Sequence, residues 1–423
     1  MAEGSPKETG EVQVTANIAG VELDARAASG VAGILDRALV GERLTPDDGY
    51  RLIDADATDL ASMMAAASEL RDRGHGRVVT YSRKVFIPLT NLCRQKCGYC
   101  TFARGPRDPI AHTMTPDDVL AVARAGARQG CKEALFSLGE RPEEIYEDVR
   151  ADLARFGHTT TSSYLREMAE LVLRETGLQP HINQGLMERD EIVSLREVSA
   201  SMGMMLETVS LRLHEKGGAH WNCPGKVPEE RLRTMRIAGE EKVAWTTGIL
   251  IGIGETREER VDSLIAIRDL HDEHRQIQEV IVQNFRVKED IAMRHRDEPS
   301  VFEMLRTIAM ARLILGPRMN IQAPPNLTPD AHGMYLLAGI NDWGGISPVT
   351  KDHINPERPW PNLLELKETC ADAGFELRER LGLYPEYVRE DPGYEGFISD
   401  GVRARIERLT DTEGLVKREE QRW

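Results

Sequence analysis

The sequence predicts an α/β protein built on a (β/α)8 barrel of the TIM type, with a helical layer before it and a helical extension after it. From about Val78 onward, short apolar runs alternate with amphipathic helical stretches, a pattern typical of a parallel sheet. Up to eight such units are present, which favours a closed barrel, whereas six would give a partial one. We expect three segments, at residues 1–78, 79–350 and 351–423.

The first 78 residues are expected to form a helical layer rather than a separate catalytic domain. Residues 1 to about 18 are polar and are expected to be loosely held. From residue 18 to about residue 73, apolar side chains recur at helical spacing, as in GVAGILDRAL. Thr45 and Thr58 are candidate N-caps, because a threonine hydroxyl can accept a hydrogen bond from a free backbone N–H.

The barrel strands are expected where short runs rich in branched apolar residues end in polar or turn residues. Helical patterns such as TPDDVLAVARAGARQG and TREERVDSLIAIRDLHDEHR lie between them. In parallel sheets, functional residues gather at the carboxyl ends of the strands. The expected strands are VFIPLTN at 85–91, EALFSLGE at 133–140, LQPHINQG at 178–185, MMLETVSL at 204–211, AWTTGILIGIG at 244–254, EVIVQNF at 279–285, MNIQAPP at 319–325 and the weaker DWGGIS at 342–347.

The C-terminal extension is expected to begin with one more amphipathic helix, LLELKETCADAGFELRERLGL, after about Pro361. From Pro385 to Trp423 the chain is charged and is broken by DPGYEG. We expect this last stretch to be a tail or linker.

Composition and charge exclude several classes of protein. The 423 residues are 41% hydrophobic and 29% charged, so a sizeable core is possible. The 54 Lys and Arg against 69 Asp and Glu give a net charge of −15, which argues against nucleic acid or an anionic membrane as the main partner. No apolar run approaches the roughly 20 residues that span a bilayer. Six cysteines in so long a chain form no disulfide framework, so a cytoplasmic location is expected.

Three of the six cysteines stand close together directly after the first expected strand. Cys93, Cys97 and Cys100 are spaced C-x3-C-x2-C within NLCRQKCGYC, and Gly98 lets the loop bend closely. Three thiolates suit an iron–sulfur cube whose fourth iron is left open. A zinc site completed by a distant histidine, or three unrelated cysteines, are the alternatives.

The spacing and position of the triad, with Tyr99 as its aromatic residue, resemble the signature of the radical S-adenosylmethionine superfamily. The resemblance implies one 4Fe-4S cluster held by Cys93, Cys97 and Cys100, which initiates the radical reaction, with S-adenosylmethionine on the open iron. One electron from the reduced cluster would then cleave the cofactor to methionine and a 5′-deoxyadenosyl radical, which the protein must shield from water.

Further strand ends resemble cofactor-binding motifs of that superfamily. Gly139 and Glu140 resemble its Gly-Gly-Glu motif, although Leu138 replaces the first glycine. This resemblance implies a contact to the methionine ammonium. Gly248 and Gly252 resemble the glycines that line the adenine, in a G-x-I-x-G-x-x-E motif with Leu250 in place of isoleucine. The strand with Glu207 and Arg212 is implied to contact the ribose and the cofactor carboxylate.

Other polar residues follow the expected strands and are candidates for substrate contacts or for loop capping. Amides that converge on a barrel mouth suit a substrate rich in carbonyls, amines and hydroxyls. The histidines and the aspartate among the candidates are possible general bases. The candidates are His181, Asn183, Gln184, His214, His220, Gln283, Asn284, Gln322, Asn326, Asp342 and Ser347.

A closer resemblance is to the 7,8-didemethyl-8-hydroxy-5-deazariboflavin (FO) synthase family. It is carried by YSRKVFIPLTNLCRQKCGYCTFARGP, MLETVSLRL, HWNCPGK, IVQNFRVK, IQAPPNL and NDWGGISPVTKDHINPE. The resemblance implies ring closure of 5-amino-5-(4-hydroxybenzyl)-6-(D-ribitylimino)-5,6-dihydrouracil with loss of ammonia, in coenzyme F-420 biosynthesis. The chain would then be a radical lyase, either a stand-alone subunit or the N-terminal half of a fused synthase.

The alternatives are the partner enzyme that couples tyrosine to 5-amino-6-ribitylaminouracil, a menaquinone-pathway cyclase, an electron-transfer or iron-delivery protein, and a zinc-stapled binding module. The partners implied by the resemblance are this small-molecule substrate, a flavodoxin or ferredoxin as electron donor, and the homologous coupling subunit or fused second half. No nucleic acid and no membrane are expected as partners.

Overall fold

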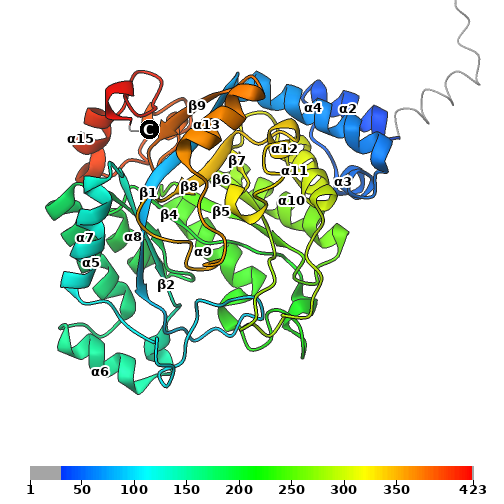
Figure 1. Cartoon of the computed structure of the whole chain (residues 1–423). Helices are drawn as coiled ribbons and strands as arrows, with labels where there is room; N and C mark the ends of the chain where they lie inside the picture. The colour runs from blue at the N-terminus through cyan, green and yellow to red at the C-terminus, as the bar shows by residue number, and fades with distance from the viewer. Residues whose placement is uncertain (1–29, 422–423) are drawn as a thin grey trace, which may run out of the picture.

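Eight parallel strands close into a barrel in the computed structural model, which describes residues 30–421 (Figure 1). The sheet closes because β1 pairs with β2 on one side and with β8 on the other. This confirms the predicted fold class. The strands are β1 (Val78–Thr90), β2 (Glu133–Leu138), β3 (Gln179–Asn183), β4 (Ser201–Gly203), β5 (Trp245–Ile251), β6 (Ile277–Asn284), β7 (Ile321–Gln322) and β8 (Asp342–Ile346).

Helices cover the outside of the barrel (Figure 1). Two of them, α3 and α5, begin with a threonine capping box followed by proline, which fixes the start of the helix. The helices are α2 (Val31–Leu39), α3 (Pro46–Ile53), α4 (Ala57–His75), α5 (Pro116–Arg128), α6 (Glu147–Arg155), α7 (Thr161–Thr176), α8 (Arg189–Arg196), α9 (Pro228–Glu240), α10 (Arg257–His274), α11 (Val301–Leu315), α12 (Met334–Leu337), α13 (Leu363–Asp372), α14 (Pro385–Val388) and α15 (Asp400–Leu409). Short 3-10 turns are η1 (Pro142–Glu144), η2 (Leu211–His214), η3 (Pro224–Lys226), η4 (Pro325–Leu327) and η5 (Arg418–Glu420).

The helical layer at the N-terminus consists of α2, α3 and α4, which lie beside α10 and α11 (Figure 1). Thr45 caps α3 as predicted, since its side chain accepts a hydrogen bond from the backbone N–H of Asp48. Thr58 does not cap α4, because Asp56 takes that position and accepts from the N–H groups of Thr58 and Asp59. The part of the predicted layer at residues 18–29 lies outside the described residues.

The fourth strand is shorter than the sequence predicts and lies before the expected run. Only Ser201–Gly203 pair as β4, and the run at 204–211 leaves the sheet. Glu207 has a φ of 67°, a left-handed conformation that interrupts a strand. One isolated bridge to Ile249 keeps this segment against β5. Backbone hydrogen bonds from Met204 to Thr246 and from Glu207 to Gly248 hold the segment beside β5, although it no longer pairs as a regular strand.

A ninth strand, β9 (Glu376–Arg380), lies where the sequence predicted the second half of a helix. Gly374, with a φ of 79°, ends α13 and turns the chain into the strand. β9 pairs in parallel with Val78–Ser82 of β1, while Lys84–Thr90 pair with β2. The C-terminal extension thus completes the barrel wall at the amino end of β1.

The stretch expected as a charged tail is folded against the barrel, near β9 (Figure 1). Its apolar side chains are separated in sequence by charged ones, so the stretch looks polar, although in the structure the apolar side chains gather on one side. Tyr387, Phe397, Val402 and Ile406 are almost fully buried in a second apolar cluster. Within residues 30–421, no helix is long and apolar enough to cross a membrane.

Glu386 gives this C-terminal region a predicted pH dependence. Burial raises the pKa of Glu386 to about 7, from 4.5, and its carboxylate accepts from Asn320 Nδ2 at 2.6 Å. Between pH 4.5 and 7 the native state therefore retains a proton that the unfolded state has lost, so stability falls as the pH rises through this range. We expect Glu386→Gln to remove about 3 kcal/mol of this pH dependence in urea unfolding. Exposed Glu407, changed to Gln, is the control; an equal effect there would contradict the assignment.

Candidate active site

Two adjoining cavities open at the carboxyl end of the barrel. The outer cavity, of about 300 Å³, is lined by the loop after β1, and the inner cavity, of about 170 Å³, lies within the barrel. Because they share part of their walls, a group bound in one lies next to a group bound in the other. The shared residues are Asn183, Met204, Met205, Ile281, Gln283, Ile354 and Asn355.

All three cysteines of the predicted triad line the outer cavity. The sulfur of Cys93 accepts hydrogen bonds from the backbone N–H groups of Gln95, at 3.3 Å, and Glu140, at 3.2 Å. The turn after β2 is thereby fixed to the cysteine loop. Gly139 allows this approach, since a Cβ there would stand 1.8 Å from the carbonyl oxygen of Leu92.

A fourth thiol, Cys223, lies beside the triad. It hydrogen-bonds with Cys97, and this bond lowers the pKa of Cys97 to about 7 while it raises the pKa of Cys223. Burial raises the pKa of Cys93 to about 12. Cys97 therefore loses its proton more readily than Cys93 does. Cys223 comes from the HWNCPGK motif, whose position near the triad could not be foreseen from spacing.

Glu140 lies at the wall of the outer cavity, as predicted, and is firmly held. Its Oε1 accepts from Arg94 Nη2 at 2.8 Å and from Gln95 Nε2 at 2.7 Å. Within the described residues, its Oε2 accepts a long hydrogen bond, 3.4 Å, from the N–H of Leu186 and forms a 4.0 Å ion pair with Arg231. One carboxylate oxygen is therefore used to fix the cysteine loop, and the other retains capacity for a further cation.

Glu207 and Lys226 form a buried ion pair in the same wall, with Lys226 Nζ 2.5 Å from Glu207 Oε1. The ammonium also lies 5.8 Å from the centre of the Tyr99 ring, within range of a cation–π contact. Tyr99 itself is buried and hydrogen-bonds through its hydroxyl to His220. Lys226 was missed by the sequence analysis, although it ends the same HWNCPGK motif.

Three residues predicted at the cofactor lie outside the wall of the outer cavity. Arg212 turns to the surface, where it pairs with Glu259 at 2.8 Å and its side chain is 47% exposed. Gly248 serves strand packing, since a Cβ there would stand 2.2 Å from the carbonyl oxygen of Ile281. Gly252, with a φ of 91°, forms the turn after β5. Leu250, between the two glycines, is the residue that lines the cavity.

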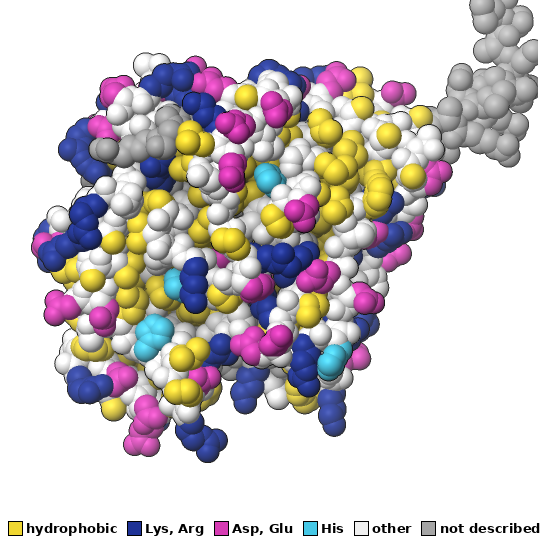
Figure 2. Space-filling view, viewed as in Figure 1, with side chains coloured by type: hydrophobic (Ala, Val, Ile, Leu, Met, Phe, Trp, Pro, Cys, Tyr) yellow, Lys and Arg dark blue, Asp and Glu magenta, His cyan; other side chains and the backbone are white. Residues whose placement is uncertain are grey.

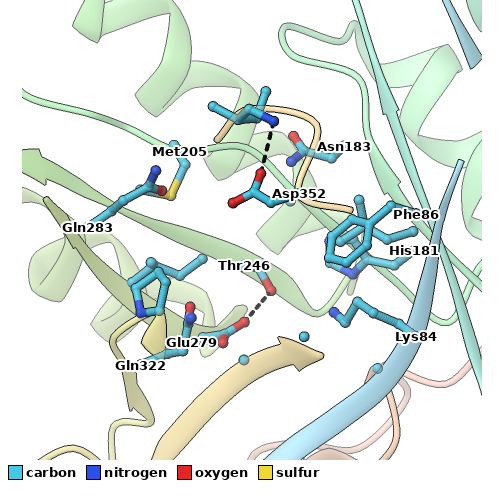
Figure 3. A pocket seen from close by; sticks show the side chains of 18 of the residues that line it. Lys84, Phe86, His181, Asn183, Met205, Thr246, Glu279, Gln283, Gln322 and Asp352 are labelled. Atoms are coloured by element: carbon cyan, nitrogen blue, oxygen red, sulfur yellow. Dashed lines mark hydrogen bonds between the residues drawn. The ribbon is translucent and has the colours of Figure 1, made fainter. Parts of the chain in front are cut away.

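The inner cavity has an apolar, aromatic side and a charged floor (Figure 3). Phe86 stacks on Trp360 with ring centres 5.3 Å apart and planes 6° from parallel. At the floor, Thr246 donates to Glu279 Oε2 at 3.1 Å, and the Lys84 side chain points into the same space. The cavity thus offers a flat apolar surface and several hydrogen-bonding groups to one ligand.

Arg380 of β9 reaches the inner cavity through the amino end of the barrel. Its guanidinium binds both carboxylate oxygens of Asp342, at 2.6 and 2.9 Å, and reaches Glu279 at 3.3 Å. It also lies 3.9 Å from the centre of the Tyr384 ring. Asp342, a candidate general base, is therefore a partner of an arginine beneath the cavity.

His181 lines the inner cavity with a defined tautomer. Ser201 Oγ donates to the carbonyl oxygen of Gly382 at 2.8 Å, so this hydroxyl must accept from His181 Nδ1, 2.7 Å away. Nε2 is left as an acceptor without a hydrogen-bond partner among residues 30–421. Burial lowers the pKa of His181 to about 4, which keeps the ring neutral at physiological pH.

The remaining polar candidates divide between the cavities and the surrounding loops. Asn183 and Gln283 lie in the shared wall, and Gln322 lines the inner cavity. Gln184 and Asn284 line the outer cavity. Those outside both walls are His214, His220, Asn326 and Ser347.

Comparison with known proteins agrees with this geometry. Residues 87–266 match the Radical SAM superfamily. Methylornithine synthase (PylB) shares the fold, with a TM-score of 0.64 at 21% identity over 81% of this chain and 97% of that chain. The FeFe-hydrogenase maturase HydG from Carboxydothermus hydrogenoformans gives a TM-score of 0.68 at 18% identity, over 85% and 81%. The barrel, the cysteine loop and this match define a radical S-adenosylmethionine enzyme.

Sequence relatives narrow this class. The 7,8-didemethyl-8-hydroxy-5-deazariboflavin synthase of Methanopyrus kandleri is 48% identical over 80% of this chain and 100% of its own length. FO synthases of Streptomyces avermitilis and Mycobacterium tuberculosis are 48% and 47% identical over 88% and 91% of this chain. The chain spans less than half of these two proteins, 44% and 46%. The chain belongs to the 7,8-didemethyl-8-hydroxy-5-deazariboflavin synthase family, as its motifs predict.

Proposed function

We propose that this chain forms 7,8-didemethyl-8-hydroxy-5-deazariboflavin by closing the central ring of 5-amino-5-(4-hydroxybenzyl)-6-(D-ribitylimino)-5,6-dihydrouracil. Ammonia leaves in the reaction, so the enzyme is a carbon–nitrogen lyase of coenzyme F-420 biosynthesis. The observation that carries the proposal is the 48% identity to the synthase of Methanopyrus kandleri over the whole of that protein. The alternative, favoured by the fused relatives of about twice the length, is that the chain also needs a second, homologous half.

The donor set of the outer cavity fits one 4Fe-4S cluster. Cys93, Cys97 and Cys100 line one cavity and would supply three thiolate ligands, and two backbone N–H groups already point at the Cys93 sulfur, as is common for cluster ligands. When bound, the cluster and S-adenosylmethionine supply a carbon radical that removes a hydrogen atom from the substrate.

The chain's own groups would position the amino-acid end of S-adenosylmethionine. Oε2 of Glu140, whose contacts to Leu186 and Arg231 are long, is complementary to an ammonium, and Lys226 with Arg231 to a carboxylate. Lys226 thereby takes the role that the sequence analysis gave to Arg212. Leu250 offers an apolar surface to the adenine.

Gly225→Ala tests the placement of Glu140. A Cβ at Gly225 would stand 1.8 Å from Glu140 Oε1 and 2.4 Å from Gln95 Nε2. Because Arg94 and Gln95 hold this carboxylate, the methyl group must displace it. We expect affinity for S-adenosylmethionine to fall at least about tenfold in calorimetric titration, a loss of about 1.4 kcal/mol, while iron content is retained.

Gly105→Ala is the matched control, because a Cβ there would meet only the Tyr146 hydroxyl, at 4.0 Å. Equal affinities in the two variants would contradict a cofactor contact at Glu140.

The substrate would occupy the inner cavity, next to the cofactor across the shared wall. The stacked Phe86 and Trp360 suit its hydroxyphenyl ring, since aromatic rings prefer stacked or edge contacts. Lys84, Thr246 and Glu279 suit the carbonyls of the pyrimidine and the hydroxyls of the ribityl chain. Ring closure needs these two parts held close together, which a single narrow cavity achieves.

His181 is the candidate acceptor for a substrate proton, because its Nε2 is unprotonated at neutral pH and lines the inner cavity. We expect His181→Gln to lower deazaflavin formation about 100-fold or more while 5′-deoxyadenosine is still produced. In the wild type, turnover should fall as the pH approaches about 4, where the ring gains a proton. The control is His158→Gln, at a histidine that pairs with Glu167 and lies outside the walls of both cavities. If His181→Gln lowered deazaflavin and 5′-deoxyadenosine formation equally, His181 would be needed for folding and not for proton transfer.

The test of the function is anaerobic reconstitution of the chain with iron and sulfide, followed by separate incubations with the joined intermediate and with tyrosine plus 5-amino-6-ribitylaminouracil. A product that fluoresces as a deazaflavin from the joined intermediate supports the proposal. Consumption of tyrosine instead assigns the chain to the coupling step. A menaquinone-pathway substrate turned over in preference to both would support the related cyclase.

A further inference from the structure

A hollow of about 370 Å³ lies on the outer side of the cysteine loop, separate from the two cavities of the active site. Alternate residues of this loop face the two spaces. Lys96 and Gly98 line the hollow, whereas Cys97 and Tyr99 line the outer cavity. A single thickness of backbone therefore separates the hollow from the thiol of Cys97, and consecutive Cα atoms are only about 3.8 Å apart.

Two further segments wall the hollow and are fixed to the loop by backbone hydrogen bonds. The N–H of Gly98 donates to the carbonyl oxygen of Ala219 at 2.8 Å, and the N–H of Met293 donates to the carbonyl oxygen of Gly98 at 3.0 Å. Trp221, 44% exposed, stands at the edge. The hollow is thus a fixed feature of the surface beside the cysteine loop.

Four exposed cations belong to the segments that wall the hollow, and we call them the basic rim: Lys96, Lys216, Arg294 and Arg296. Lys96 and Arg296 line the hollow itself, whereas Lys216 and Arg294 directly adjoin lining residues in sequence. None makes an ion pair or side-chain hydrogen bond with a residue between 30 and 421. Surface arginines elsewhere are commonly paired, as Arg43 is with Asp269 and Asp272.

Two carboxylates, Glu215 and Asp297, adjoin the basic rim in sequence, so the local balance is four positive charges against two negative ones. The whole chain, by contrast, carries a net charge of −15. Figure 2 shows Lys and Arg side chains projecting at the lower edge of the molecule, the side along which the loop after β1 runs in Figure 1. An acidic partner would be repelled by the chain as a whole and attracted at this place.

We infer that the basic rim and its hollow are the docking surface of an acidic electron-carrier protein. The inference rests on the radical chemistry proposed above, which needs one electron for each cofactor cleaved. The electron would leave the carrier, which is oxidised, and would reduce a cluster held by Cys93, Cys97 and Cys100, with no bond formed or broken. Short-lived electron-transfer complexes bury little surface and depend on charge, which suits a small hollow with unpaired cations.

The test compares two charge-reversed triple variants of the reconstituted holoenzyme. The rim variant is Lys216→Glu/Arg294→Glu/Arg296→Glu, which leaves the cysteine loop unchanged. The control is Arg128→Glu/Arg318→Glu/Arg408→Glu, which makes the same change in charge. Arg128 and Arg318 lie before β2 and β7, at the opposite end of the barrel, and Arg408 lies in α15.

The probe is a bacterial flavodoxin, and its binding is measured by calorimetry at low and high salt. We expect the rim variant to bind at least about tenfold more weakly, the wild type to lose affinity as salt rises, and the control variant to bind as the wild type does. With dithionite as reductant, both variants should form 5′-deoxyadenosine at the wild-type rate. The inference would be overturned if the two variants lost flavodoxin binding equally, or if neither variant lost it.

A second measurement uses only the wild type. Carbodiimide joins lysine ammonium groups to carboxylates in contact, so flavodoxin should become linked to Lys96 or Lys216, as identified by peptide mass spectrometry. Linkage confined to lysines away from the hollow would overturn the inference even if the rim variant does not fold. Failure of the proposed ring closure would be seen in a separate assay: the reconstituted chain would form no deazaflavin from the joined intermediate when dithionite is the reductant.

Discussion

Cys97→Ala is expected to reduce 5′-deoxyadenosine formation to background, because it removes one of three thiols that line the outer cavity. Three thiolates suffice to hold a cluster with one open iron, and two do not fill the three remaining iron positions. Iron and sulfide content after anaerobic reconstitution, together with the visible absorbance of the cluster, provides the measurement.

Two other cysteines serve as controls for this variant. Cys131 is buried and is expected to be inert, since burial raises the pKa of its thiol to about 12. Cys131→Ala should retain the cluster. Cys223→Ala should also retain it if Cys223 only hydrogen-bonds to Cys97. Zinc in place of iron, lost in Cys97→Ala and in Cys223→Ala alike, would indicate a four-thiol zinc site instead.

Arg380→Met is expected to lower the free energy of unfolding by about 3–5 kcal/mol, because it leaves two carboxylates buried without their cation. Asp342 is fully buried and Glu279 nearly so, and Arg380 holds both. Urea unfolding followed by circular dichroism measures the change. The cysteine loop does not contact Arg380, so the fraction of protein that folds should still take up iron.

Arg378→Met is the matched control on the same strand. Arg378 pairs with Asp411 and Glu413, whose side chains are 27% and 68% exposed, so water can solvate them once the arginine is gone. We expect a smaller loss there. The triple variant Arg380→Met/Asp342→Asn/Glu279→Gln should recover much of the stability. If all three variants were equally unstable, the ion pairs would not be the cause.

The cysteine loop was predictable because its three cysteines are close in sequence and directly follow a strand of a parallel barrel. Gly139 and Glu140 were predictable for the same reason, since they end the neighbouring strand. Lys226 and Cys223 were not, because they lie on a later loop that folds back over the mouth. A local sequence pattern does not show which loop folds back over the barrel mouth. Arg212, which lies closer in sequence to the fourth strand, forms an ion pair with Glu259 instead.

The predicted secondary structure was wrong in two segments whose polar or charged residues are buried in the structure. The run at 204–211 is mostly buried, but apart from one bridge between Glu207 and Ile249 it does not pair as a strand. The strand β9 reads as ELRER, which resembles an exposed helix, yet Arg378, Glu379 and Arg380 are all buried. Charged residues can occupy a buried strand when each finds an opposite charge, and those partners lie far away in sequence.

The pairing of β9 with β1 also determines when the barrel can be completed during synthesis. Val78 and Glu376 are neighbours in the sheet although roughly 300 residues separate them, a contact of very long range that closes slowly. While only the first eight strands have left the ribosome, the amino end of β1 therefore has an unpaired strand edge. The cysteine loop, by contrast, follows the carboxyl end of β1, which pairs with β2 and does not depend on β9.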